Sequence, residues 1–162
     1  LGLDLTTGEI VCADLTKDDV GDPTALAELF DQIDAPVLRF LADGAYDGDP
    51  TSDLLVERFG EAVEIIIPPP ITAVPSPDAA HDPTPRDKRI AAIRDKGRMA
   101  WQASSGYNQR SRGETQMGRW KTVIGPKLKA RSLPNQKTEV RIGVNILNKM
   151  TKLGRPKFEA VA

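Results

Sequence analysis

A proline-rich segment in the middle of the chain limits what the chain can fold into. Seven of the 13 prolines among the 162 residues fall in PPPITAVPSPDAAHDPTP, from Pro68 to Pro85, which shows no apolar periodicity. Because proline fixes φ and removes a backbone donor, the segment predicts a loop or semi-rigid linker. The only histidine, His81, lies in it. We expect His81 to be exposed, since no set of metal ligands is spaced around it.

Short strands and helices alternate before this segment. The stretches LGLDL and EIVCADL, joined by TTGE, predict a hairpin of two antiparallel strands, with Cys12 buried. The next stretches predict an amphipathic helix of about three turns, a strand, a second helix and a buried strand: VGDPTALAELFDQI, PVLRFLAD, TSDLLVERFG and AVEIIIP. Residues 1–67 are therefore expected to form a mixed α/β sheet flanked by helices.

Only helices are predicted after the proline-rich segment. They correspond to RDKRIAAIRDKGRMAWQ, to YNQRSRGETQMGRWKTVIG and to NQKTEVRIGVNILNKMTKLG, which stops at Gly154. Glycines weaken the middle one. Trp101 and Trp120 lie at helical spacing from apolar residues, which favours core packing over base stacking.

The two halves of the chain carry opposite charge. Residues Leu1–Pro85 include 18 acidic and three basic side chains, whereas Arg86–Ala162 include five acidic and 19 basic ones. Either the halves neutralise each other in the fold, or the basic half binds a polyanion. No apolar run approaches the roughly 20 residues that span a bilayer, so we expect a cytoplasmic protein.

Asp43 is a candidate ligand residue because it directly follows the strand PVLRFL. Ligand sites of open α/β sheets gather past the carboxyl ends of strands, and a carboxylate there can hold a cation. Beside Gly44, Asp43 is equally suited to begin a turn. Asp47 and Asp49 lie further into the loop, and we expect them to serve in a turn or as helix caps.

Four side chains of YNQRSRGETQMGRWK share one face of the predicted helix. At about 100° per residue they fall within an arc of about 60°; they are Tyr107, Arg110, Glu114 and Lys121. A solvated face with an ion pair between Arg110 and Glu114 would explain two of them. A metal-binding carboxylate beside phosphate-binding cations and an aromatic ring would explain all four.

With these residues the chain resembles the DDE transposases of bacterial insertion sequences. Tyr107, Arg110, Glu114 and Lys121 match the YREK signature, Y-(2)-R-(3)-E-(6)-K, of these transposases. The stretch LADGAYDG is similar to their second-aspartate motif. The stretch RWKTVIGPKLKARSLPNQKTEVRIGVNILNKM resembles the tail of the insertion-sequence-five group.

The resemblance implies an RNase H-like fold in which two aspartates and a glutamate hold two divalent ions, Mg²⁺ or Mn²⁺. By position, Asp43 would be the second carboxylate and Glu114 the third. Arg110 and Lys121 would hold DNA phosphates near the scissile bond, and Tyr107 would contact the transposon end. The implied partners are terminal inverted repeats, target DNA and further copies in a synaptic complex, with the protein on the nucleoid when bound.

Further basic side chains are candidates for DNA binding. Arg112 and Arg119 lie on the opposite side of the predicted helix, and Lys127, Lys129 and Arg131 cluster in GPKLKAR. A solvated face is the alternative for this cluster. We expect phosphate contact.

The first aspartate of the family comes from a strand before the opening hairpin, and the chain begins inside that hairpin. Asp4 precedes the TTGE turn, so it is not expected to replace this aspartate. We expect the C-terminal part of a transposase: a partial catalytic core without its first strand over 1–67, a loop over 68–85, and a basic helical part over 86–162. Its N-terminal part or a partner reading frame would supply the missing aspartate. The alternatives are an inactive DNA-binding remnant and a cellular RNase H-like nuclease.

Overall fold

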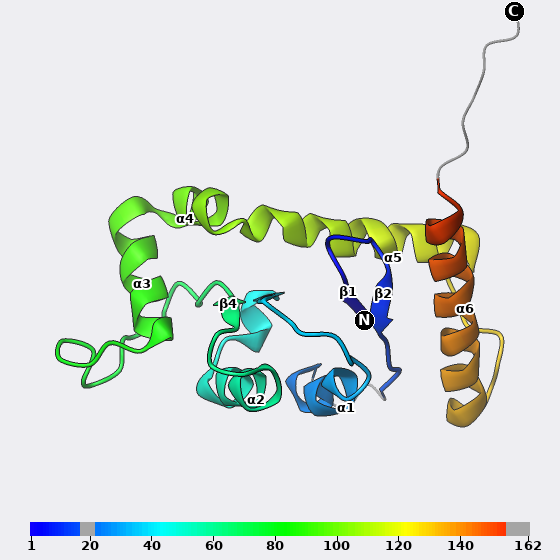
Figure 1. The fold of residues 1–162 in the computed structure, drawn as a ribbon, viewed down its shortest axis with the longest axis horizontal. Coiled ribbons are helices and arrows are strands. Elements are labelled where there is room, and N and C mark those ends of the chain that lie inside the picture. Colours follow the sequence, from blue (N-terminus) through cyan, green and yellow to red (C-terminus); the bar gives the residue numbers. More distant parts are fainter. Residues whose placement is uncertain (17–21, 155–162) are drawn as a thin grey trace, which may run out of the picture. The chain divides into compact units, whose positions relative to one another are not determined.

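The computed structural model describes residues 1–16 and 22–154 (Figure 1). They divide into two compact units. The hairpin unit comprises residues 1–16, 28–33 and 112–154, and the parallel-strand unit comprises residues 22–27 and 34–111. Each unit has one two-stranded sheet. Among the helices of the described residues, none combines the length and hydropathy that a membrane span requires.

The predicted hairpin is confirmed in the hairpin unit. Strand β1 (Gly2–Leu3) pairs antiparallel with β2 (Ile10–Cys12). Between them Gly8 has a φ of 77°, which glycine adopts without steric cost. Cys12 is buried as expected, and this burial raises the pKa of its thiol.

The first predicted helix is shorter than expected. It consists of the 3₁₀ turn η1 (Asp22–Ala25) and α1 (Leu26–Phe30). After α1 the N–H groups of Gln32 and Ile33 donate to carbonyls three residues earlier, so the chain tightens and the helix ends. Pro36 follows closely, and a residue before proline disfavours helical backbone angles.

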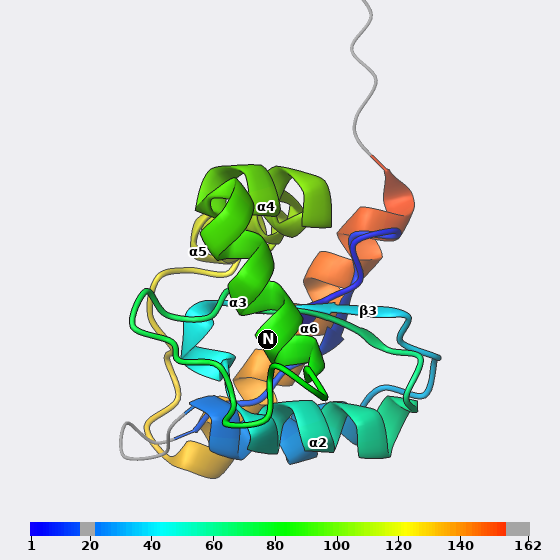
Figure 2. The ribbon, with the colours of Figure 1, turned by 90° about the vertical axis from the view of Figure 1, so that its left-hand side faces the viewer.

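The parallel-strand unit contains a strand, a helix and a parallel strand in chain order. Strand β3 (Arg39–Leu41) pairs with β4 (Glu64–Ile66), and the crossover contains α2 (Asp49–Phe59). Helix α2 covers one side of the strand pair (Figure 2), and its Leu55 is fully buried. This helix and both strands are confirmed, and each strand, with three residues, is shorter than predicted.

Residues 67–84 form neither helix nor strand, and α3 (Pro85–Lys96) follows them. One continuous helix was predicted to extend past Gly97, and this prediction is wrong. Gly97 has a φ of 84°, which breaks the segment into α3 and α4 (Arg98–Ser105). The two helices run in different directions (Figure 1).

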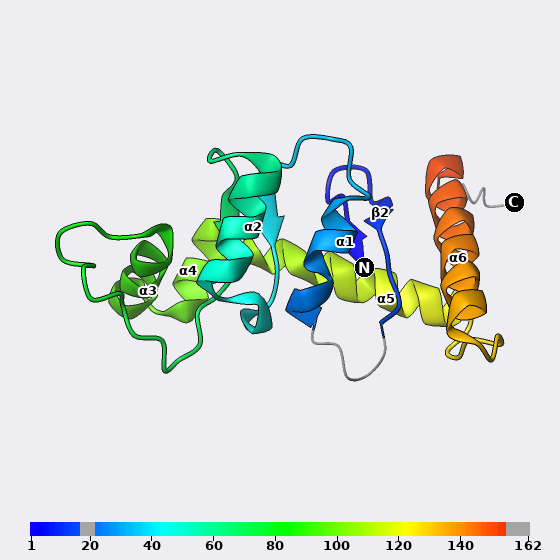
Figure 3. The same cartoon turned by 90° about the horizontal axis from the view of Figure 1, so that it is seen from below.

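The predicted helix from Tyr107 begins with a tighter turn. Residues Tyr107–Arg110 form the 3₁₀ turn η3, and α5 (Ser111–Val123) follows. The last helix, α6 (Leu133–Leu153), is uninterrupted (Figure 3) and ends before Gly154 as predicted.

Helices α5 and α6 pack closely within the hairpin unit. The Trp120 ring of α5 lies against Gly143 of α6 at a place where any Cβ would overlap the ring. Trp101, in the parallel-strand unit, is 6% exposed. Core packing is thus confirmed for Trp101, and Trp120 packs against a helix. The α/β class is confirmed, whereas the RNase H-like sheet stays a prediction.

Candidate functional site

Asp43 follows β3 and begins the next turn. One carboxylate oxygen accepts a hydrogen bond from the Ala45 N–H at 3.0 Å, which caps the 3₁₀ turn η2 (Gly44–Tyr46). The other oxygen lies 3.8 Å from Nη2 of Arg110. The side chain is 47% exposed. Asp43 therefore serves its turn, as one interpretation predicted, and still presents an accessible oxygen.

Residues 105–110 meet β3 at both of its ends. Arg39, the first residue of β3, donates to the Ser105 carbonyl at 2.7 Å and to the Glu64 carboxylate at 2.6 Å. Past the other end, Arg110 faces Asp43. Two parts of the sequence that were singled out separately are thereby brought together in the parallel-strand unit.

Tyr107 and Arg110 support each other. Arg110 Nε donates to the Tyr107 hydroxyl at 3.1 Å, and the guanidinium lies 5.9 Å from the centroid of the ring. On a 3₁₀ turn, residues three apart eclipse, which places both side chains on one side. The buried Trp101 ring lies 5.8 Å from the Tyr107 ring and backs it. The Tyr107 side chain is therefore held beside Arg110, the residue that lies next to Asp43.

Glu114 and Lys121 lie on α5 in the hairpin unit, and both are exposed. Seven residues apart, they differ by about 20° around the helix axis, so they share a face. Glu114 lies in the first turn, where a carboxylate complements the helix dipole. That the Glu114 carboxylate lies near the Asp43 carboxylate stays a prediction.

Arg112 and Arg119 make bonds within the hairpin unit. Arg112 Nη1 donates to the Leu5 carbonyl at 2.6 Å. Arg119 donates to the Thr151 hydroxyl at 2.7 Å and to the Leu147 carbonyl at 3.3 Å. These bonds tie α5 to the hairpin and to α6, a use that sequence spacing did not indicate. The contact with DNA that was predicted for Arg112 stays a prediction, and the bonds of Arg119 favour a structural role for its guanidinium over the predicted contact.

The basic cluster Lys127, Lys129 and Arg131 lies on the loop between α5 and α6, with all three side chains exposed. The loop backbone is fixed, because the N–H groups of Ala130 and Lys129 donate to Glu139 at 2.8 and 2.9 Å. These bonds lower the pKa of the Glu139 carboxyl. The cluster thus presents cations from an anchored loop, and its contact with phosphate stays a prediction.

Asp47 serves in the turn, as expected, and its carboxylate has a further role that was not predicted. Its N–H closes the η2 turn onto the Gly44 carbonyl, but its carboxylate caps nothing there. The carboxylate is 1% exposed and pairs with Arg86 and Arg89 of α3. Sequence reasoning missed this pairing because Arg86 is 39 residues away along the chain. Asp49 lies in the first turn of α2, where an acidic residue is favourable.

Asp4 is used by its own turn. Its carboxylate accepts from the Thr7 hydroxyl at 2.7 Å and from the Thr6 N–H at 2.8 Å. These bonds, led by that from Thr7, lower the pKa of the Asp4 carboxyl. His81 is exposed, as expected.

Carboxylate oxygens are the ligands that Mg²⁺ prefers, and the accessible carboxylates of Asp43 and Glu114 fit such an ion chemically. Within residues 1–16 and 22–154, no three His, Cys, Asp or Glu side chains gather in an arrangement that could hold a metal. A metal role for the two carboxylates stays a prediction.

Comparison with known proteins agrees with the resemblance to DDE transposases. No solved structure gives a significant match to the chain. The family model described as a transposase DDE domain matches residues 1–148, which is most of the sequence. The chain belongs to the transposase DDE domain family.

Proposed function

We propose that this chain belongs to a transposase of the YREK type, insertion-sequence-five group, which cleaves DNA strands at insertion-sequence ends and joins them to target DNA. Membership of the DDE family indicates transposition-related cleavage and transfer of DNA in general. The observation that best supports the finer proposal is the meeting of Arg110 with Asp43 at 3.8 Å. Arg110 of the YREK signature and Asp43 of the second-aspartate motif lie next to each other, as they should if both belong to one site.

The two carboxylates would hold divalent ions, Mg²⁺ or Mn²⁺. The chemistry that such ions supply is activation of the attacking hydroxyl and stabilisation of the leaving oxygen. Asp43 offers the oxygen that now faces Arg110, and its other oxygen keeps the carboxylate oriented through Ala45. Glu114 offers an exposed carboxylate from the first turn of α5. The resemblance puts the first aspartate of the set on a strand preceding the hairpin, and we propose that the assembled transposase completes the set there.

The cations would bind the DNA backbone. A guanidinium binds phosphate through two parallel hydrogen bonds, and Arg110, 32% exposed, can exchange its contact with Asp43 for one with phosphate. Tyr107, backed by Trp101, would contact a base or sugar at the transposon end. Lys121 shares a face with Glu114 and would hold a neighbouring phosphate, and the anchored basic loop would extend the contact. Synapsis of two ends calls for further copies of the protein.

A strand-cleavage assay tests this proposal. The product of the complete reading frame that contains this chain is mixed with a plasmid that carries the element ends, with and without Mg²⁺. Asp43→Asn and Glu114→Gln should each lower the cleavage rate by at least about a hundredfold while DNA affinity is retained. Asp53→Asn, an exposed carboxylate on α2, is the matched control and should cleave normally. Full cleavage by either site variant would refute the assignment. Salt-sensitive DNA binding without cleavage by the unaltered protein would favour the inactive remnant.

A further inference from the structure

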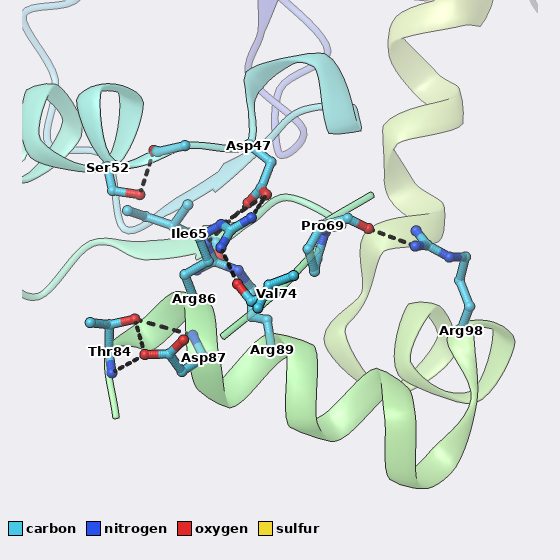
Figure 4. A network of polar contacts seen from close by, with 11 residues as sticks. Asp47, Ser52, Ile65, Pro69, Val74, Thr84, Arg86, Asp87, Arg89 and Arg98 are labelled. Atoms are coloured by element: carbon cyan, nitrogen blue, oxygen red, sulfur yellow. Dashed lines mark hydrogen bonds and ion pairs between the residues drawn. The ribbon is translucent and has the colours of Figure 1, made fainter. Parts of the chain in front are cut away.

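The carboxylate of Asp47 is enclosed by two arginines of α3 (Figure 4). Arg86 Nε and Nη2 both lie 2.9 Å from Oδ2, and Arg89 Nη2 lies 3.8 Å from Oδ1. With 1% of the Asp47 side chain exposed, the charge is removed from water. A buried carboxylate is tolerated only when it is paired. This contact is therefore a fixed part of the parallel-strand unit.

Both arginines also hold other parts of the unit. Arg86 Nη1 donates to the Val74 carbonyl in the proline-rich segment, and Arg89 Nη1 donates to the Ile65 carbonyl of β4, each at 3.3 Å. Burial lowers the pKa of the Arg89 guanidinium, and the charge of Asp47 opposes that shift. Through these two arginines Asp47 is thus linked to helix α3, to strand β4 and to the proline-rich segment.

Asp43 and Asp47 are the two ends of one turn. The Tyr46 N–H donates to the Asp43 carbonyl at 3.1 Å, and the Asp47 N–H donates to the Gly44 carbonyl at 3.2 Å. The turn is pressed against the chain that follows β4, because a Cβ on Gly44 would lie 3.0 Å from the Pro68 carbonyl oxygen. Fixing Asp47 therefore restricts the backbone that carries the Asp43 carboxylate.

We infer that Asp47 is a positioning residue, whose ion pair with Arg86 and Arg89 holds the turn of residues 43–47 so that Asp43 is presented to a divalent cation in one orientation. The inference rests on the proposed role of Asp43 as a metal ligand. A metal-binding side chain that is already ordered binds an ion more tightly, because no conformational entropy has to be lost on binding. If the fraction of molecules whose turn presents Asp43 in the binding orientation fell to about a tenth, the apparent Kd for the ion would rise about tenfold.

Two variants weaken the ion pair from opposite sides. Asp47→Asn keeps the shape of the side chain but leaves two guanidinium groups without a counter-charge. Arg86→Gln removes the nearer partner and leaves Asp47 with Arg89, so the burial of charge stays balanced. If both act through the same contact, the double variant should be no worse than the worse single variant. Asp53→Asn is the control.

The test is a titration with Mn²⁺ of the same protein as in the cleavage assay, in which free Mn²⁺ is followed by electron paramagnetic resonance, together with amide hydrogen exchange. Asp47→Asn and Arg86→Gln should each weaken Mn²⁺ binding at least about fivefold and speed exchange at the amides of residues 45–47. Asp43→Asn should remove the Mn²⁺ site and Asp53→Asn should change neither readout.

The outcomes separate this inference from the proposed function. Normal Mn²⁺ binding by Asp47→Asn and Arg86→Gln, with binding lost in Asp43→Asn, would show that Asp47 serves the fold only and would overturn the inference. Normal binding by Asp43→Asn, or no binding by the unaltered transposase, would contradict the metal role of Asp43, and the inference would fall with it.

Discussion

The side-chain amide of Asn148 on α6 forms two hydrogen bonds with the backbone of Ile10 on β2, as a neighbouring strand would. Its side-chain nitrogen donates to the Ile10 carbonyl at 2.8 Å, and its side-chain oxygen accepts from the Ile10 N–H at 2.8 Å. The outer edge of β2 thus has its backbone groups satisfied by a single amide at this position. Such a pairing protects a strand edge and anchors α6 to the hairpin.

This pairing predicts a specific effect of Asn148→Asp. A carboxylate accepts from the Ile10 N–H but donates nothing to the Ile10 carbonyl, so one bond is lost and two acceptors face each other. We expect a loss of about 1–3 kcal/mol in the free energy of unfolding, measured with urea. Asn145→Ala, an exposed position on the same helix, should change it by less than about 0.5 kcal/mol. Equal stabilities of the two variants would exclude the pairing.

The same substitution should act with opposite sign at two glycines. Gly143→Ala places a methyl group inside the Trp120 ring, and such overpacking costs about 1–3 kcal/mol. Gly118→Ala, in α5 with open space around it, should raise the free energy of unfolding by about 0.5–1 kcal/mol through helix propensity. Thermal melts of both variants measure this, and stabilisation by Gly143→Ala would show that α5 and α6 do not meet there.

Acid should weaken the parallel-strand unit through Asp87. Hydrogen bonds from Ser76 and Thr84, led by that from the Ser76 N–H, hold the pKa of the Asp87 carboxyl well below its usual range. A carboxyl whose pKa is lower in the folded than in the unfolded state stabilises the folded state. This stabilisation is complete at pH values above the unfolded-state pKa of about 3.9, and it is lost as the pH falls below that value.

The loss can be assigned by comparing melting temperatures from about pH 6 to pH 2. Asp87→Asn should be less stable at neutral pH and should lose less on acidification than the unaltered chain. Asp95→Asn, an exposed carboxylate on the same helix, should follow the unaltered chain. Parallel curves for Asp87→Asn and the unaltered chain would contradict the assignment.

Two cations of α5 should differ in their effect on DNA binding. Lys121 is exposed on the face of Glu114, so Lys121→Gln should lower the slope of log affinity against log salt by about 0.9, as expected for one lost phosphate contact. The guanidinium of Arg119 is bonded to Thr151 and Leu147, so Arg119→Gln should lower the melting temperature and leave the slope nearly unchanged. A larger change of slope for Arg119→Gln would reverse these roles.

Elements with strong local signals could be predicted from the sequence. The hairpin follows from apolar runs around TTGE, α2 from its helical pattern after Pro50, and the end of α6 from Gly154. The shared side of Tyr107 and Arg110 was also predicted. It holds on the 3₁₀ turn because residues three apart eclipse there.

What could not be predicted depends on contacts distant in sequence. A glycine inside a helical pattern is tolerated or breaks the helix according to its surroundings, and Gly97 breaks its segment while Gly118 does not. The burial of Asp47 depends on α3, which lies beyond the proline-rich segment, so no local pattern marks it. The bonds of Arg112 and Arg119 likewise reach other elements of the hairpin unit.

The central proposal is that Asp43 and Glu114 belong to one set of ligands for divalent ions, and iron-directed cleavage of the protein tests it most directly. When ascorbate and peroxide are added, Fe²⁺ bound to the protein cuts the backbone near its ligands. Mass spectrometry then locates the cuts. We predict cuts near both residue 43 and residue 114, suppressed by excess Mg²⁺ and lost at both places in Glu114→Gln. Cuts near residue 43 that persist unchanged in Glu114→Gln would contradict the proposal.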